Sequence, residues 1–243
     1  MTMIRTENLT KFYGEIRAVY RLNMEVPEGT ILGFLGPNGA GKTTTMRMLT
    51  GYTTPSFGKA EIAGIEIQKE PIKAKRLIGY LPEVPPLYPE LKVRSFLEFV
   101  GQVKGLRGKE LKNRIEEVVE KTGLEKVADR LIRNISKGYR QRVGIAQAIL
   151  ADPKVLILDE PTIGLDPKEI VEIRQLIKSL AGKRTVILST HILQEVTSIC
   201  DTIAIINEGR LIEFGKIEEI EKKYGSASLE EIYISAISKE VKA

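Results

Sequence analysis

The stretch Gly36-Pro37-Asn38-Gly39-Ala40-Gly41-Lys42-Thr43-Thr44 fits the pattern G-x-x-x-x-G-K-[ST] and directly follows the apolar run Ile31–Leu35. This pattern is typical of a P-loop, in which successive backbone N–H groups converge on the phosphates of a nucleotide. Glycines at positions 36, 39 and 41 are expected to adopt backbone angles that other residues rarely reach. The sequence therefore predicts one nucleotide site, between a strand and a helix.

The residues at the end of this loop predict how the nucleotide is held. Lys42 supplies a full positive charge, and Thr43 is expected to place its hydroxyl on the Mg²⁺ that accompanies the nucleotide. Met46 and Leu49 continue the chain as a helix whose N-terminus adds a partial positive charge toward the phosphates. Strand, loop and helix signals occur in the order that the motif requires, which disfavours a chance glycine-rich turn.

The composition is that of an ordinary globular chain. Its 243 residues carry 37 Lys and Arg against 32 Asp and Glu, a formal charge of +5. The basic residues are scattered among acidic ones, which favours a solvated surface over a nucleic-acid interface. The single cysteine, Cys200, is expected to be a small buried hydrophobe. We find no signal peptide and no apolar run near the ~18 residues of a membrane span, so we expect a soluble, cytoplasmic chain.

Hydrophobic periodicity predicts an α/β fold with three parts. Alternating runs at 3–8, 18–26 and 59–67 predict an N-terminal antiparallel β-subdomain. A short strand at 77–81 leads into a proline-rich loop at 82–89, and helical spacing follows from 93 to 150. Strands at 155–158, 185–188 and 203–206 alternate with stretches of helical length, which indicates a mainly parallel sheet.

The chain is predicted to be a single domain, 1–243, with a P-loop NTPase core. Residues 1–85 and 153–215 form this nucleotide-binding core with its β-subdomain, and 86–152 form an inserted helical subdomain. After a hairpin turn at 207–210 and a strand at 211–214, residues 216–243 are expected to form a short helical extension. Its helices are predicted at 217–224 and 229–237, and Ser228 with Glu231 fits a capping box for the second.

Three polar side chains follow predicted strands at the edge where open α/β sheets bind ligands. Asp159 and Glu160 end the buried strand at 155–158; Asp159 is expected to hold Mg²⁺ through a water, and Glu160 to orient the water that attacks the γ-phosphate. An acidic helix start is the alternative. His191, the only histidine, follows the strand at 185–188 and could bind the γ-phosphate, although lone histidines are more often structural.

Two further features have functional and structural explanations. Ser136 and Gly138, on either side of Lys137, begin a helix that runs to Leu150 and could receive an anion, but an N-cap serine explains this start equally well. Tyr13, expected on a loop after Phe12, could stack on a base or pack into the core.

Together these motifs resemble the nucleotide-binding domain of an ATP-binding cassette (ABC) protein over nearly the whole chain. The resemblance implies ATP and Mg²⁺ as cofactors, with residues 36–44 around the phosphates and Tyr13 against the adenine. It also assigns Ser136, Lys137 and Gly138 to the signature motif, Asp166 to a D-loop at 164–166, and Glu83 to the Q-loop position, a metal ligand beside Thr43 and Asp159. Two such chains, identical or different, are expected to pair head to tail, so that the signature of one closes over ATP held by the other.

Two departures from the family pattern point to one branch. The signature is Ile-Ser-Lys-Gly-Tyr instead of Leu-Ser-Gly-Gly-Gln, and Glu83 replaces the usual glutamine. Both resemble the ABC-2-type branch, in which a separate integral membrane permease exports the substrate and the ATPase lies at the cytoplasmic face of the membrane. The serine and the second glycine, which contact phosphate in the family, remain.

Other classes of nucleotide-binding protein fit less well. A soluble cassette ATPase acting on nucleic acid or ribosomes is the main alternative, but such proteins usually carry tandem cassettes or long coiled-coil insertions, and this sequence has neither. A GTP switch would need an Asn-Lys-x-Asp motif, which does not occur here. The resemblance therefore implies an ATPase that drives export, with a substrate selected by the permease.

Overall fold

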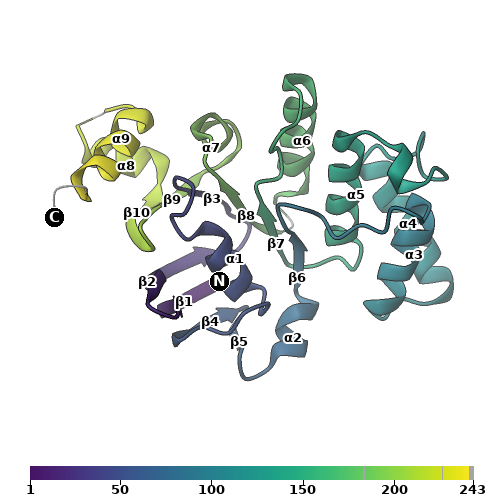
Figure 1. The fold of residues 1–243 in the computed structure, drawn as a ribbon, viewed down its shortest axis with the longest axis horizontal. Helices are drawn as coiled ribbons and strands as arrows, with labels where there is room; N and C mark the ends of the chain where they lie inside the picture. The colour runs from purple at the N-terminus through teal and green to yellow at the C-terminus, as the bar shows by residue number, and fades with distance from the viewer. Residues whose placement is uncertain (183, 226, 241–243) are drawn as a thin grey trace.

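A six-stranded sheet lies at the centre of the protein (Figure 1). The computed structural model describes residues 1–182, 184–225 and 227–240. The strand order is β10-β9-β3-β8-β7-β6, and every neighbouring pair is parallel except β9 with β10. The strands are β3 (Ile31–Leu35), β6 (Ile78–Leu81), β7 (Val155–Asp159), β8 (Thr185–Thr190), β9 (Thr202–Asn207) and β10 (Arg210–Lys216). The predicted mainly parallel sheet is confirmed.

Strands β3, β7, β8 and β9 of this sheet are buried along their whole length, which explains their largely apolar sequences. In β7, Val155 and Ile157 belong to the core shared with the N-terminal sheet and α1 (Lys42–Leu49). Leu156 and Leu158 belong to the opposite core, which includes the helices of the inserted segment. Successive side chains of a strand point to opposite faces, so one short run joins two hydrophobic cores.

The N-terminal sheet is antiparallel, as predicted, with strand order β2-β1-β4-β5. Its strands are β1 (Thr2–Tyr13), β2 (Ile16–Pro27), β4 (Phe57–Ile62) and β5 (Ile65–Glu66). The single strand predicted at 59–67 is wrong: Ala63 and Gly64 have φ of 50° and 78° and turn the chain between β4 and β5. The loop predicted around Tyr13 is also wrong, because this residue is the last of β1.

The inserted segment forms a cluster of helices beside β6 and β7 (teal in Figure 1). It consists of α3 (Val93–Val103), α4 (Gly108–Lys121), a 3₁₀ turn (Ile132–Asn134) and α5 (Lys137–Ile149). The remaining helices are α2 (Pro71–Arg76), which the sequence did not predict, α6 (Pro167–Leu180), α7 (Leu193–Ile199), α8 (Ile217–Lys223) and α9 (Leu229–Glu240). The proposed subdomain boundaries stay a prediction.

The C-terminal helices agree with the sequence pattern. At the start of α9, the Ser228 N–H donates to the Glu231 carboxylate at 2.9 Å, and the Glu231 N–H donates to Ser228 Oγ at 3.3 Å. The predicted capping box is therefore confirmed.

Cys200 is 8% exposed and lies against β3, and burial raises the pKa of its thiol. This is the environment expected of a small structural hydrophobe.

Close packing of β6 on α5 gives a prediction for stability. A Cβ on Gly79 would overlap the backbone of Ala148 and lie 2.9 Å from Pro153 Cγ. Because the obstacle is mostly backbone, we expect Gly79→Ala to lower the free energy of unfolding by about 1–3 kcal/mol. Gly215→Ala is the matched control: its Cβ would meet side-chain atoms no closer than 3.6 Å, and we expect a change within about 0.5 kcal/mol. Urea denaturation measures both, and equal stabilities would contradict the packing argument.

Candidate active site

The P-loop connects β3 to α1 and depends on its glycines for two different reasons. Gly39 and Gly41 have φ of 81° and 101°, in the left-handed region, as expected. Gly36 does not, so that part of the prediction is wrong. The Cα of Gly36 instead packs closely against the backbone of β9, where a Cβ would overlap the Ile206 carbonyl oxygen. Close approach of two strands, and not an unusual backbone angle, requires glycine at position 36.

The side chain of Lys42 is buried beside this loop. Its Nζ donates to the carbonyl oxygens of Gly36 at 2.8 Å and Pro37 at 3.2 Å. It also lies 3.4 Å from a carboxylate oxygen of Glu160, and both side chains are less than a tenth exposed. A buried ammonium and carboxylate each need a partner of opposite charge. The loop and the end of β7 are therefore joined by one ion pair.

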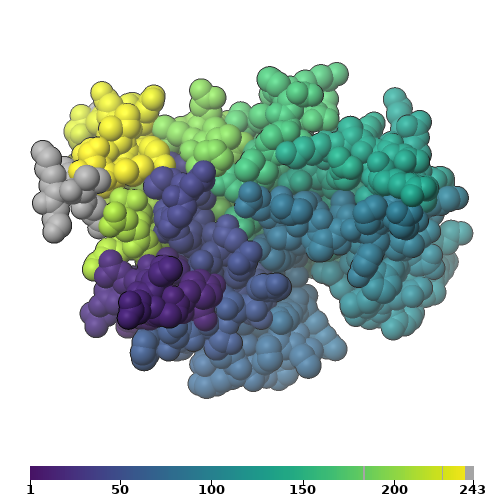
Figure 2. Space-filling model, viewed as in Figure 1, coloured from purple at the N-terminus to yellow at the C-terminus, as the bar shows by residue number. Residues whose placement is uncertain are grey.

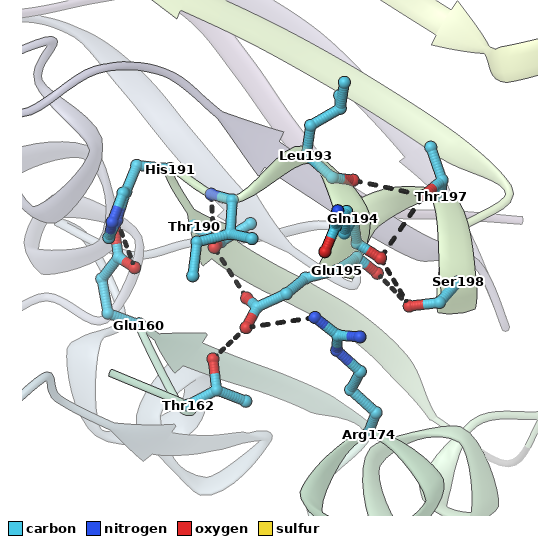
Figure 3. Close-up of polar contacts among 11 residues, drawn as sticks. Glu160, Thr162, Arg174, Thr190, His191, Leu193, Gln194, Glu195, Thr197 and Ser198 are labelled. Carbon is cyan, nitrogen blue, oxygen red and sulfur yellow. Dashed lines mark hydrogen bonds and ion pairs between the residues drawn. The ribbon is translucent and has the colours of Figure 1, made fainter. Parts of the chain in front are cut away.

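Glu160 brings the three predicted catalytic residues together. It follows β7 with φ of 48°, and its N–H donates to the Ser189 carbonyl at 2.9 Å. Its carboxylate meets Nδ1 of His191 at 3.0 Å, as Figure 3 shows. His191 comes directly after β8 and is 37% exposed. Lys42, Glu160 and His191 thus form a continuous chain of contacts at the carboxyl ends of neighbouring strands.

The three predicted metal ligands also share one site. Thr43, Glu83 and Asp159 line a cavity of about 610 Å³ that extends toward α2 and the end of α3. Figure 2 shows a hollow on this side, between the blue surface of α2 and the teal surface of the inserted helices. Glu83 is exposed, whereas Asp159 is completely buried. The cavity therefore combines the Thr43 hydroxyl, an exposed carboxylate at its rim and a buried carboxylate at its base.

The environment of Asp159 is that of a carboxylate able to bind a metal ion. Neither carboxylate oxygen has a hydrogen-bond partner among the described residues. Burial raises the pKa of this carboxyl above its ordinary value, and the negative charges of Glu160 and Glu83 add to the shift. Mg²⁺ is bound by one or two carboxylates together with phosphates and waters. The residues fit such an ion, which would satisfy the unpaired oxygens.

The predicted signature residues lie apart from Lys42, at the start of α5. Ser136 and Lys137 are exposed, and Ser136 Oγ accepts a hydrogen bond from the Tyr139 N–H at 3.3 Å, so the N-cap explanation is confirmed. Gly138 is buried against the Glu169 carboxylate, which would have to move to admit a Cβ. Lys137 reaches Gly164 in the predicted D-loop. The two predicted segments of one chain are therefore direct neighbours.

Two other predicted positions lie at element ends. Asp166 is the exposed N-cap residue of α6. Tyr13 is 44% exposed, with Lys11 Nζ 5.1 Å from the ring centre. This exposure excludes the core-packing alternative for Tyr13 and leaves its ring accessible to a base.

Sequence reasoning missed a buried polar cluster behind the site. Glu195, on α7, is fully buried and contacts Thr162, Thr190 and Arg174 (Figure 3). A signal was available: Glu195 lies four residues before Ile199, so both occupy one face of the helix. An acidic residue on the apolar face of a helix indicates a buried carboxylate with specific partners.

Comparison with known proteins places this geometry in a family. The family model described as "ABC transporter" matches residues 19–163, more than half of the chain. The chain belongs to the ABC transporter family.

The similarity to members of this family extends over most of the chain. The bacitracin transport ATP-binding protein BcrA of Bacillus licheniformis is 45% identical over 228 residues, which cover 92% of this chain and 74% of that protein. The Nod factor export ATP-binding protein I of Cupriavidus metallidurans is 38% identical over 233 residues, 95% of this chain and 77% of its own.

Solved structures of ABC proteins share the fold. One described as the ATP binding subunit of an ABC transporter has a TM-score of 0.87 and 31% identity, covering 97% of this chain and 99% of that one. A dimeric post-hydrolysis structure of the ATP-binding cassette MJ0796, bound to ADP and Pi, has a TM-score of 0.80 and 29% identity over 88% and 98% of the two chains. As a member of the family, the chain is an ATP-binding and ATP-hydrolysing subunit of an ABC transporter, and the soluble alternative is disfavoured. Of its described helices, none combines the length and apolar character needed to cross a membrane.

The burial of Asp159 predicts that its charged carboxylate lowers the stability of the folded protein. A folded-state pKa above the unfolded value means that the folded state binds more protons between the two values, so stability falls as pH rises through that window and stays lower above it. We therefore expect Asp159→Asn, without nucleotide or Mg²⁺, to unfold at a higher temperature than the parent at pH 7, by about 2–4 °C for each kcal/mol recovered. The gain should shrink as pH falls toward the ordinary aspartate value of about 3.9.

Differential scanning calorimetry across pH measures this effect. Asp129→Asn, at an exposed carboxylate, is the matched control and should show no comparable gain. An Asp159→Asn protein that is less stable than the parent at neutral pH would show that the carboxylate is not penalised by burial.

Proposed function

We propose that this chain hydrolyses Mg²⁺–ATP to drive export of a substrate through a separate membrane permease. The contact chain of Lys42, Glu160 and His191 at the edge of the sheet supports hydrolysis at this site. The relatives named above support export, since their names describe bacitracin transport and Nod factor export. In this proposal the chain works at the cytoplasmic face of the membrane, attached to the permease.

In this proposal the loop at 36–44 surrounds the phosphates of ATP. Its backbone N–H groups and the start of α1 provide partial positive charge, and Lys42 exchanges its carbonyl and carboxylate partners for phosphate oxygens. Thr43 and Asp159 would hold Mg²⁺, with Glu83 as a third group at the rim. The metal supplies positive charge that neutralises the developing charge on the phosphates. Tyr13 would stack on the adenine with its exposed ring.

Glu160 and His191 divide the chemistry at the γ-phosphate. Glu160 would orient the attacking water and accept its proton, as a carboxylate in hydrogen-bond reach can do. Because carboxylate oxygens only accept, Nδ1 of His191 is the donor in the observed contact. A protonated ring then also donates from Nε2, which is the group that would bind a γ-phosphate oxygen. Glu160 thereby positions the ring as well as the water.

A second ABC ATPase chain, identical or different, would complete each site. Ser136 and Lys137 are exposed at a helix start, where an anion from another chain can approach. In this arrangement Ser136, Lys137 and Gly138 contact the ATP bound by the partner, and Asp166 lies at the interface. The dimeric MJ0796 structure supports such pairing. Glu83, in the loop between β6 and α3, would transmit the nucleotide state to the permease.

Replacement of Glu160 tests the hydrolytic mechanism. We expect Glu160→Gln to bind ATP within about threefold of the parent but to lose about 10²–10⁴-fold in turnover, because general-base assistance contributes that much. ATP should then accumulate in a stable dimer on size-exclusion chromatography. Glu110→Gln, at an exposed glutamate on α4, is the control and should keep parental turnover. Rapid hydrolysis by Glu160→Gln would refute its role.

Reconstitution of the parent with its permease in proteoliposomes tests export itself. Substrate should move only with the parent chain and not with Glu160→Gln. Transport that continues with the inactive variant would refute coupling of hydrolysis to export.

Mixed dimers test the second chain. Ser136→Arg blocks the signature and Lys42→Ala removes the phosphate-binding ammonium, so neither variant alone should hydrolyse ATP. A mixed dimer contains one site with an intact Lys42 facing an intact Ser136, and we expect part of the ATPase activity to return. Absence of activity in mixed dimers verified by mass spectrometry would refute assembly of the site across chains.

A further inference from the structure

The buried Glu195 carboxylate connects the two chain segments that carry Glu160 and His191 (Figure 3). Glu195 lies in the first turn of α7 and its side chain is 1% exposed. One carboxylate oxygen accepts from the Thr162 hydroxyl, and the other accepts from the Thr190 hydroxyl at 2.7 Å. Each oxygen of the Glu195 carboxylate therefore contacts a different segment of the site.

The Thr190 contact fixes the backbone on both sides of His191. Thr190 precedes the histidine, and its Oγ1 donates to Glu195 while accepting from the Ile192 N–H at 3.0 Å. A hydroxyl has one donor, so a carboxylate that takes this hydrogen leaves the oxygen free to accept from Ile192. The two residues that flank His191 are thereby joined by a hydrogen bond, and this bond is anchored to Glu195.

The Thr162 contact reaches the other catalytic segment. Thr162 lies two residues after Glu160, within a turn in which the Ile163 N–H donates to the Glu160 carbonyl at 3.2 Å. Glu160 itself has a left-handed φ of 48°, which a non-glycine residue keeps only when its surroundings enforce it. The bond from Thr162 to Glu195 is one such constraint.

Arg174 supplies the opposite charge. Its Nη2 lies 3.8 Å from the same Glu195 oxygen that Thr162 contacts, and its buried Nε has no partner among the described residues. Arg174 lies on α6, the helix that begins after Asp166. A buried carboxylate with two hydroxyl donors and one guanidinium is a specific arrangement that an amide cannot reproduce, because an amide has only one accepting atom.

We propose that Glu195 is a positioning residue that holds Glu160 and His191 in mutual register for hydrolysis and, through Arg174, ties them to the helix after the D-loop. The proposal rests on the roles of Glu160 and His191 given above. Among the described residues, the polar contacts of Glu195 do not include the P-loop, and Glu195 does not line the cavity around Thr43 and Asp159. Its loss should consequently change turnover and not nucleotide binding.

Steady-state kinetics of Glu195→Gln separate these effects. We expect kcat to fall about 10–100-fold, since small misplacement of reacting groups costs about that much, with the ATP KM within about threefold. Gln194→Ala, at the exposed neighbour on α7, is the control and should keep the parental kcat. Thr190→Val should reproduce the loss without altering the buried charge, and Thr190→Ser should restore activity because it keeps the hydroxyl.

A double-mutant cycle distinguishes positioning from general destabilisation. In a His191→Ala background, we expect Glu195→Gln to lower kcat by a clearly smaller factor than in the parent, because one of the two residues that it positions is gone. A parental kcat in Glu195→Gln, or an equal loss with and without His191, would overturn the proposal. An unchanged kcat in His191→Ala alone would instead refute the role of His191, so the two failures give different results. If Glu195→Gln does not fold, Thr190→Val and Thr190→Ser decide the question.

Discussion

The buried contact between the Lys42 ammonium and the Glu160 carboxylate is the interaction on which the site depends. It joins the loop after β3 to the end of β7, two strands separated in the sheet by β8. Each group would be strongly disfavoured in this environment without the other. The ion pair can form because parallel strands end at the same edge, and His191 then follows from the end of β8 between them. Phosphate oxygens offer Lys42 an equivalent partner of negative charge.

The same edge of the sheet concentrates groups that the rest of the fold would not tolerate. Asp159 is buried with unpaired oxygens, and Ser189 Oγ beside it is also unpaired among the described residues. Two hydrophobic cores pack against the strands from both faces and hold these polar groups at the edge of the sheet. Proteins often accept such local penalties at functional sites. In the proposed function, a nucleotide and its cation would neutralise this charge and satisfy the oxygens.

Sequence patterns predicted the residues that meet at the site better than the surrounding contacts that hold them in place. The P-loop, Asp159, Glu160 and His191 were found because each follows an apolar strand, and adjacent parallel strands must end together. The burial of Glu195 could have been predicted from its helix face, but its partners come from three separate segments, and no local pattern encodes their meeting. The break between β4 and β5 was missed although the apolar positions change phase there, from 60 and 62 to 65 and 67, and Gly64 is a turn signal. The reason for Gly36 was wrong because close approach to β9 depends on the sheet order.

A crystal structure of the chain with Mg²⁺ and a non-hydrolysable ATP analogue tests the exchange of partners at Lys42 most directly. We expect Lys42 Nζ to lie within about 3.2 Å of a phosphate oxygen, the usual limit for such a hydrogen bond, and to have left the Glu160 carboxylate. Metal density should lie beside Thr43 and Asp159. Lys42 still paired with Glu160, with the phosphates bound elsewhere, would contradict the assignment of this loop and this ion pair as the nucleotide site.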